Sequence, residues 1–313
     1  MTSKFVLCAV LTVLCSAVWA EAAPEETASA TGIPVNLVVT AEARHGDSVP
    51  VINREDVMVY QNRDRAEVTG WAPAQEERAG LELFVLIDDS SNVSLGSQIE
   101  DLREFINSQP ASTKIGVAYM QNGMAQVLQN LTADHSQAAK ALRLPLGMPG
   151  VNSSPYFSLA DLIKRWPASG SRREVLMVSD GVDRFWGSGP DDPYIASVIE
   201  QAQRAGIIVF VIYTPGVGHY GVSFWRIWWG QNYLSRVADE TGGESYSIGF
   251  YGAPVSFVPY LDGVSRRLSH QYWLTFIAAP GKKAGMQRVR VTTEVPNVDL
   301  VSADSIYVPA ESK

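Results

Sequence analysis

Oxygen-bearing side chains follow an apolar run at two places in the sequence, and their spacing suits metal coordination. The first segment carries Asp88, Ser90 and Asn92 at alternate positions, which would place three hard oxygen donors on one side of an extended loop. In the second segment, Asp180 comes just after the end of another apolar run. Carboxylate, hydroxyl and amide oxygens are ligands that Mg²⁺ and Mn²⁺ accept. The sequence therefore predicts a divalent-metal site that includes the first three side chains.

The same residues also have a purely local interpretation. In that alternative, Asp88 and Asp180 cap loop amides or helix N-termini, while Ser90 and Asn92 make hydrogen bonds within a turn and no ion is bound. Two neighbouring carboxylates are alternates: Asp89 and Asp183. They would replace the predicted ligands if the register is off by one residue, or would support those ligands without binding the metal directly.

The elements that would position these side chains are strands buried on both faces. Unbroken apolar runs at 83–87, 175–178 and 207–212 are typical of parallel strands covered by helices. Apolar residues at helical spacing occupy 99–106 and 195–202, and Gly206 predicts the end of the second helix. This alternation predicts a doubly wound, mostly parallel α/β sheet, in which sites lie at the carboxyl ends of the strands.

The two ends of the chain follow a different pattern. Apolar and polar residues alternate at 35–41 and again at 289–295, and short strand-like runs occur at 57–60 and 306–308. Two or three such strands are not stable alone. We therefore expect both chain ends to pair in one small antiparallel β unit, with the α/β domain inserted between them. The expected boundaries are 33–80 for the N-terminal strands, 81–278 for the α/β domain and 279–313 for the C-terminal strands.

Together these segments resemble the von Willebrand factor A (VWFA) domain and its metal-ion-dependent adhesion site. In that family a strand-ending Asp-x-Ser-x-Ser, a Thr in a second loop and an Asp in a third hold one divalent cation. The resemblance covers roughly 81–278, and the flanking strands are similar to those of secreted bacterial VWFA-related proteins. On matching positions it implies five ligands for Mg²⁺ or Mn²⁺: Asp88, Ser90, Asn92, Ser154 and Asp180.

The resemblance also implies a function and shows two departures from the family pattern. It implies a protein that mediates protein–protein interaction or adhesion, in which an acidic residue of a protein partner completes the coordination of the metal. Asn92 stands where the family has a second Ser, and Ser154 stands where it has a Thr. Asn is longer than Ser, and Mg²⁺ tolerates little distortion of its octahedral geometry.

An aromatic segment offers a metal-free alternative for partner binding. Its residues would form an apolar contact surface if they are exposed: Tyr220, Trp225, Trp228 and Trp229. The competing interpretation is that Trp225 and Trp228, three residues apart, form the inward face of a helix.

The N-terminus is typical of an exported protein. Residues 1–20 contain Lys4, an apolar stretch too short to span a bilayer and a small-residue cleavage site, which predicts a signal peptide. Residues 21–32 have the composition of a flexible leader. We expect the mature chain to be exported to the periplasm, the cell surface or the medium, with no further membrane span.

Charge and missing motifs exclude several other functions. The 33 acidic and 25 basic residues give a net charge of −8, which disfavours nucleic acid as a partner. Both cysteines, Cys8 and Cys15, lie inside the expected signal peptide, so thiol catalysis is not expected. The sequence contains no nucleophile elbow, no phosphate-binding lysine loop and no zinc-like histidine spacing. We therefore predict a binding protein and not an enzyme, and rank a metal-assisted hydrolase as the last alternative.

Overall fold

The computed structural model describes residues 32–46, 48–91, 95–147, 154–185, 192–216, 223–247 and 254–310. The expected signal peptide and nearly all of the expected leader lie outside the described residues, as do Asn92 and Tyr220. Within the described part of the chain, no helix is long and apolar enough to cross a membrane.

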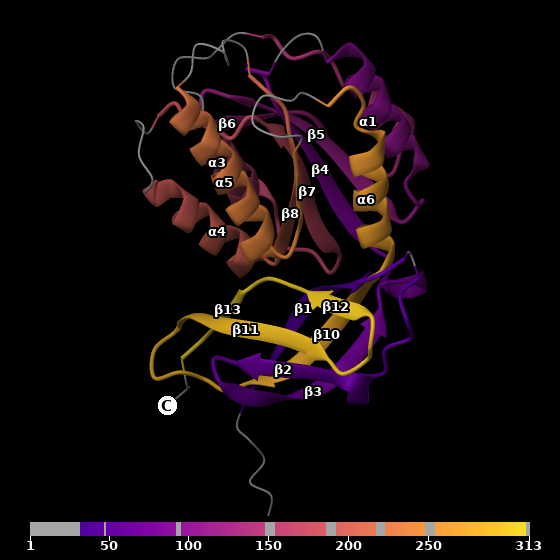
Figure 1. The fold of residues 1–313 in the computed structure, drawn as a ribbon, viewed down its shortest axis with the longest axis vertical. Coiled ribbons are helices and arrows are strands. Elements are labelled where there is room, and N and C mark those ends of the chain that lie inside the picture. Colours follow the sequence, from indigo (N-terminus) through magenta and orange to yellow (C-terminus); the bar gives the residue numbers. More distant parts are fainter. Residues whose placement is uncertain are drawn as a thin grey trace, which may run out of the picture. The chain divides into compact units, whose positions relative to one another are not determined.

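A six-stranded sheet forms the centre of the middle part of the chain (Figure 1). Its strand order is β6-β5-β4-β7-β8-β9, and all neighbours are parallel except β5 and β6. The bounds are β4 Leu81–Asp88, β5 Thr113–Gln121, β6 Met124–Thr132, β7 Arg172–Ser179, β8 Ile207–Tyr213 and β9 Ser245–Tyr246. All residues of β4, and all but one of β7, are buried, as unbroken apolar runs predict.

Helices cover both faces of this sheet. Leu83, Val85 and Ile87 pack in one apolar cluster with α1, α2 and α6, while Phe84 and Leu86 pack in another with α3, α4 and α5. The chain is therefore an α/β fold in its middle part, with the sheet between two helical layers (Figure 1). The helices are α1 Gly96–Ser108, α2 His135–Lys140, α3 Pro155–Arg165, α4 Pro193–Ala205, α5 Phe224–Thr241 and α6 Val258–Ser269.

The second sheet is antiparallel and has seven strands in the order β12-β1-β10-β3-β2-β11-β13. The two chain ends pair in it as expected from the sequence, because β1 pairs with β12 and β2 pairs with β11. The bounds are β1 Ile33–Ala43, β2 Val57–Gln61, β3 Asp64–Pro73, β10 Gln271–Ala278, β11 Gly285–Thr293, β12 Val298–Val301 and β13 Ser305–Val308. Two short 3-10 helices, η1 Arg54–Asp56 and η2 Glu76–Arg78, lie in the connections.

One expected boundary is wrong. We assigned residues up to 278 to the α/β domain, but β10 lies between β1 and β3 of the antiparallel sheet. The chain leaves the α/β part at the end of α6, near Ser269. The physical reason is that Leu274 and Phe276 complete the apolar cluster of the antiparallel sheet, whereas the α/β sheet ends at the short strand β9.

Candidate functional site at the carboxyl edge of the α/β sheet

The predicted ligand residues that the structure describes lie where the strand order of the α/β sheet reverses. The chain starts at β4, moves outward to β5 and β6, and later returns to β7 on the other side of β4. In such sheets, the crevice between the two central strands is the usual position of a ligand site. Asp88 is the last residue of β4, and Asp180 directly follows β7. The topology therefore brings together two carboxylates that are far apart in the sequence.

The Asp88 carboxylate is buried and held by serine donors. Its Oδ1 accepts hydrogen bonds from the Ser90 amide at 2.9 Å and the Ser90 hydroxyl at 2.7 Å, and its Oδ2 accepts one from the Ser179 hydroxyl at 2.9 Å. Burial raises the pKa of Asp88 and the charge of Asp180 raises it further, which outweighs the effect of the Ser90 hydrogen bonds. The two carboxylates are therefore close enough to interact electrostatically.

Asp180 carries an arginine partner that the sequence analysis did not identify. Arg184 Nη2 donates to Asp180 Oδ2 at 3.0 Å, and the Val182 amide donates to Asp180 Oδ1 at 2.9 Å. Burial lowers the pKa of Arg184, but the charges of Asp180, Asp88 and Asp183 raise it, and the net shift is upward. One guanidinium thus pairs with Asp180 and interacts electrostatically with the carboxylates of Asp88 and Asp183. The sequence does place an arginine four residues after Asp180. The direction in which its side chain points could not be predicted from the sequence.

Ser154 lies at the same edge but does not contact the two central carboxylates directly. It is the N-cap of α3, and its hydroxyl accepts a hydrogen bond from the Phe157 amide and donates one to Asp183 Oδ2 at 2.8 Å. Asp183, considered above only as an alternate, therefore links Ser154 to the group around Arg184. Of the five predicted ligands, the structure describes four, and Asn92 lies outside the described residues.

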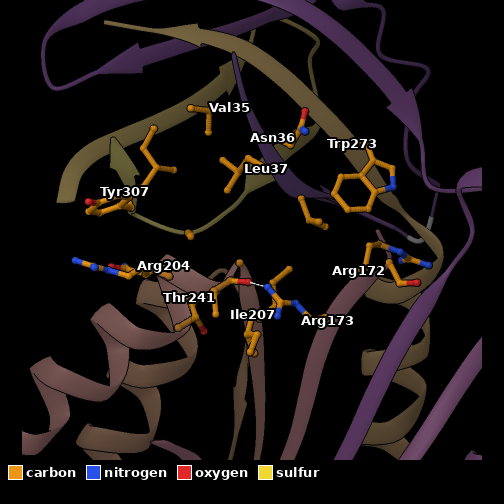
Figure 2. Close-up of a pocket in the computed structure, with 18 of the residues that line it drawn as sticks. Val35, Asn36, Leu37, Arg172, Arg173, Arg204, Ile207, Thr241, Trp273 and Tyr307 are labelled. Atoms are coloured by element: carbon orange, nitrogen blue, oxygen red, sulfur yellow. Dashed lines mark hydrogen bonds between the residues drawn. The ribbon is translucent and has the colours of Figure 1, made fainter. Parts of the chain in front are cut away.

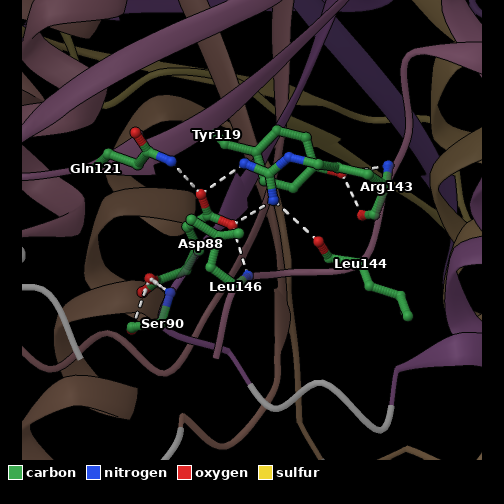
Figure 3. A network of polar contacts seen from close by, with 8 residues as sticks. Asp88, Ser90, Tyr119, Gln121, Arg143, Leu144 and Leu146 are labelled. Atoms are coloured by element: carbon green, nitrogen blue, oxygen red, sulfur yellow. Dashed lines mark hydrogen bonds and ion pairs between the residues drawn. The ribbon is translucent and has the colours of Figure 1, made fainter. Parts of the chain in front are cut away.

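Asp89 belongs to a separate polar network that holds the neighbouring loop, and Figure 3 labels its partners Gln121, Arg143 and Leu146. Arg143 donates to both of its carboxylate oxygens at 2.6 Å, and the Gln121 amide group and the Leu146 backbone amide also donate to it. The Arg143 guanidinium lies 3.9 Å from the centre of the Tyr119 ring. Burial raises the pKa of Asp89, but these donors outweigh it and hold the pKa below its usual value. Asp88, and not Asp89, is therefore the carboxylate that interacts with Asp180.

The donor chemistry at this edge suits a hard cation, but the arrangement of the side chains does not. Carboxylates and hydroxyls are present, and the buried Ser91 hydroxyl has no hydrogen-bond partner among the described residues. However, Arg184 already places a positive charge against Asp180, and this charge also acts on Asp88. The described residues form no group of three or more His, Cys, Asp or Glu side chains that could hold a metal ion. As the side chains stand, Mg²⁺ or Mn²⁺ does not fit beside Arg184.

An exposed group of aromatic rings lies at the start of α5, and we call it the aromatic cluster. The Trp225 ring lies 5.7 Å from that of Phe224, 6.2 Å from that of Trp228 and 6.4 Å from that of Trp229, measured between ring centres. Trp225 is 59% exposed and Trp228 is 39% exposed. The interpretation of Trp225 and Trp228 as an inward helix face is therefore wrong. Ile227, Gly230 and Leu234 form the buried face instead.

The aromatic cluster is fixed next to the carboxylates because α5 packs on the loop after β7. A Cβ atom at Gly181, whose φ is +70°, would lie 2.3 Å from the Gly230 carbonyl oxygen, so glycines at both positions allow this close approach. Arg226 Nη2 also donates to the Asp183 carbonyl at 3.3 Å. The first turns of α5 and the buried charges therefore belong to one edge of the molecule.

A separate cavity of about 300 Å³ lies at the opposite end of the strands, between the two sheets (Figure 2). Its lining includes Arg172 and Arg173 at the start of β7, Arg204 near the end of α4, and Trp273 and Tyr307 of the antiparallel sheet. The Arg204 guanidinium lies 4.2 Å from the centre of the Tyr307 ring. No pattern in the sequence indicates this cavity, because its lining comes from both parts of the chain.

No family model and no curated protein matches the sequence. Among solved structures, the chain is similar to a von Willebrand factor type A protein from Catenulispora acidiphila, with 12% identity and a TM-score of 0.46 over 82% of this chain and 74% of that one. It is similar to VWA2, the ArnB paralog from Sulfolobus acidocaldarius, with 10% identity and a TM-score of 0.40 over 88% and 76%. The likeness to BatB from Bacteroides thetaiotaomicron has 14% identity and a TM-score of 0.34, and spans 43% of this chain and 66% of that one.

Proposed function

We propose that this chain is an exported binding protein that holds a protein partner at the carboxyl edge of its α/β sheet. The observation that carries the proposal is the aromatic cluster on α5, which exposes Phe224, Trp225 and Trp228 on a rigid helix. Exposed Trp residues are costly in water, and they are the side chains that contribute most to the affinity of protein interfaces.

The position of the cluster supports binding at this edge. α5 is anchored by its buried face, Ile227, Gly230 and Leu234, so the exposed rings are presented without ordering a flexible segment. The antiparallel sheet lies beyond the other end of the strands (Figure 1). There it lines the cavity together with the start of β7 and of β8 (Figure 2). A partner at the carboxyl edge would therefore meet the α/β part alone.

The metal-dependent form of this function, expected from the resemblance, is a different prediction about the same edge. It requires Mg²⁺ or Mn²⁺ and an acidic residue on the partner. The aromatic cluster requires neither, and Arg184 already supplies a cation next to Asp180. We therefore propose binding through apolar contact, without a metal and without catalysis.

The experiment is affinity capture from the envelope fraction of the source organism with the purified chain as bait. We expect one or more specific partners to be retained by wild type and by Leu128→Ala, and lost with Trp225→Ala and Trp228→Ala. Leu128 is a matched control because it is 48% exposed on β6, away from α5. Each Trp variant should keep the wild-type unfolding temperature, since its side chain is exposed.

The outcomes separate the two forms of binding. Capture that survives EDTA and fails with Trp225→Ala supports the proposal. Capture that is abolished by EDTA and unaffected by Trp225→Ala would show that the metal-dependent prediction is correct and that the aromatic cluster is not the contact surface. Turnover of peptides or phosphate esters by the purified chain would contradict the assignment as a binding protein.

A further inference from the structure

Arg184 is largely buried, although it lies in the loop after β7. Its side chain is 14% exposed, and its partner carboxylate on Asp180 is 1% exposed. Arg184 Nη1 also donates to the Val182 carbonyl at 3.4 Å, which holds the side chain against its own loop. The guanidinium is therefore fixed at the edge of the sheet and does not extend into solvent.

The charge around Arg184 explains why it is held there. The guanidinium forms an ion pair with Asp180 and interacts electrostatically with two further buried carboxylates, those of Asp88 and Asp183. A nearby cation stabilises the ionised form of carboxylates in such a place, because the interior of a protein solvates charge poorly. In the described residues, Arg184 is the cation that acts on Asp88 and Asp180 together.

The backbone closes over this ion pair. A Cβ atom at Gly216 would lie 2.3 Å from Asp180 Oδ2 and 3.2 Å from Arg184 Nη2, so the chain after β8 passes directly over both groups. Gly216 also forms an isolated antiparallel bridge with Ser91, in the segment after β4. The loops after β4, β7 and β8 thus meet around the guanidinium, and a second cation next to Asp180 would have to displace it.

We infer that Arg184 is the resident cation of this edge and excludes a divalent metal from the carboxylates of Asp88 and Asp180. The positive charge that holds the loops after β4, β7 and β8 together is then part of the protein itself. Their arrangement would not depend on the availability of a metal ion. A dication near the guanidinium would be repelled by it, and that repulsion is strong at low effective dielectric constant. Loss of the guanidinium charge would leave the carboxylates of Asp88 and Asp180 without the cation that they share and would open these two groups to Mn²⁺.

The test is a titration of the purified chain with Mn²⁺, followed by the electron paramagnetic resonance signal of free Mn²⁺ and by the shift in unfolding temperature. We expect wild type to show no saturable binding at this edge. Arg184→Gln removes the charge and should bind Mn²⁺ at least tenfold more tightly than wild type, with a matching rise in unfolding temperature. Arg184→Lys keeps the charge and should behave like wild type.

Two controls make the result specific. Arg236→Gln removes an exposed arginine that pairs with Glu240 on α5, and it should leave Mn²⁺ binding unchanged. Asp88→Asn added to Arg184→Gln should abolish the gained binding. If Arg184→Gln is unfolded without metal, recovery of its far-ultraviolet circular dichroism on addition of Mn²⁺ supports the inference, and failure to recover contradicts it.

The inference would be overturned by equal Mn²⁺ affinity in wild type and Arg184→Gln, or by an equal gain in Arg184→Lys. It concerns the same edge as the proposed function but does not depend on the partner. Loss of capture by Trp225→Ala tests the proposed function alone, and Mn²⁺ binding by Arg184→Gln tests the resident cation alone, so each can fail while the other holds.

Discussion

A buried glutamate in the middle of the α/β sheet should make the stability of this protein depend on pH. Glu174 lies on β7, is 0% exposed, and neither of its carboxylate oxygens has a hydrogen-bond partner in the described structure. Burial raises its pKa from 4.5 to about 7, although Arg172 and Gln271 act in the opposite direction. Folding therefore disfavours the ionised form of this side chain.

The size of the effect follows from the shift in pKa. A rise from 4.5 to about 7 corresponds to about 3 kcal/mol in the free energy of unfolding, at 1.36 kcal/mol per pKa unit. Because the pKa is higher in the folded state, the contribution is fully present below pH 4.5 and is lost as the pH rises through about 7. Ionisation of Glu174 should thus lower the stability of wild type as the pH rises from 4.5 to about 7.

The substitution Glu174→Gln removes the charge and keeps the shape. We expect it to match wild type near pH 4.5 and to exceed it by about 3 kcal/mol at pH 8.5, measured by urea unfolding across the pH range. Glu82→Gln on the neighbouring strand β4 is the control. The Glu82 carboxylate accepts a hydrogen bond from Trp166 Nε1 at 2.8 Å, so its amide variant should gain nothing at pH 8.5. A difference between Glu174→Gln and wild type that does not change with pH would refute the reasoning.

Three further substitutions test other features by thermal or urea unfolding. Arg143→Met should lower the free energy of unfolding by about 2 kcal/mol, because it leaves the nearly buried carboxylate of Asp89 without its charged donor. An unchanged free energy of unfolding would show that the network is not stabilising. Gly181→Ala should lower the free energy of unfolding by about 3 kcal/mol or more, since a Cβ atom there meets the Gly230 carbonyl and the φ of +70° disfavours alanine. A melting curve like that of wild type would contradict this packing. Thr214→Val should raise the free energy of unfolding by up to about 1 kcal/mol, because the buried Thr214 hydroxyl has no hydrogen-bond partner in the described structure. A lower free energy of unfolding would indicate that a bound water satisfies this hydroxyl.

The strands that could be predicted from the sequence are those in which burial on both faces determines the residue types. β4, β7 and β8 are buried on both faces, so their apolar runs are unbroken and easy to recognise. β5 and β6 were not predicted. Gly116 interrupts the β5 run because a side chain there would collide with Phe84, and β6 alternates as an edge strand does. β10 was assigned to the wrong part because its pairing with β1 and β3 depends on residues far away in the sequence.

At the candidate site, the sequence predicted which strand ends meet but not how the side chains are arranged. Asp88 and Asp180 were identified because hydrophobic strands that end in carboxylates share one edge of a parallel sheet. The role of Arg184 depends on the direction of a long side chain, which sequence spacing does not determine. The orientation of α5 was missed for a similar reason, since Gly230 serves as a buried contact with the loop after β7 and carries no apolar side chain to mark that face.

The insertion of the α/β part between paired chain ends has a consequence for the order in which the molecule can assemble. Thr40 on β1 and Gln271 on β10 are register partners, yet they are 231 residues apart. During synthesis, β1 and β3 are made first, but β10, the strand that lies between them, becomes available only when nearly the whole chain has been made. The insert can collapse earlier, because its strands and helices are contiguous in sequence. Maturation of the antiparallel sheet is then a late closing step, and a nascent chain stalled before residue 271 would carry unpaired strand edges that invite aggregation.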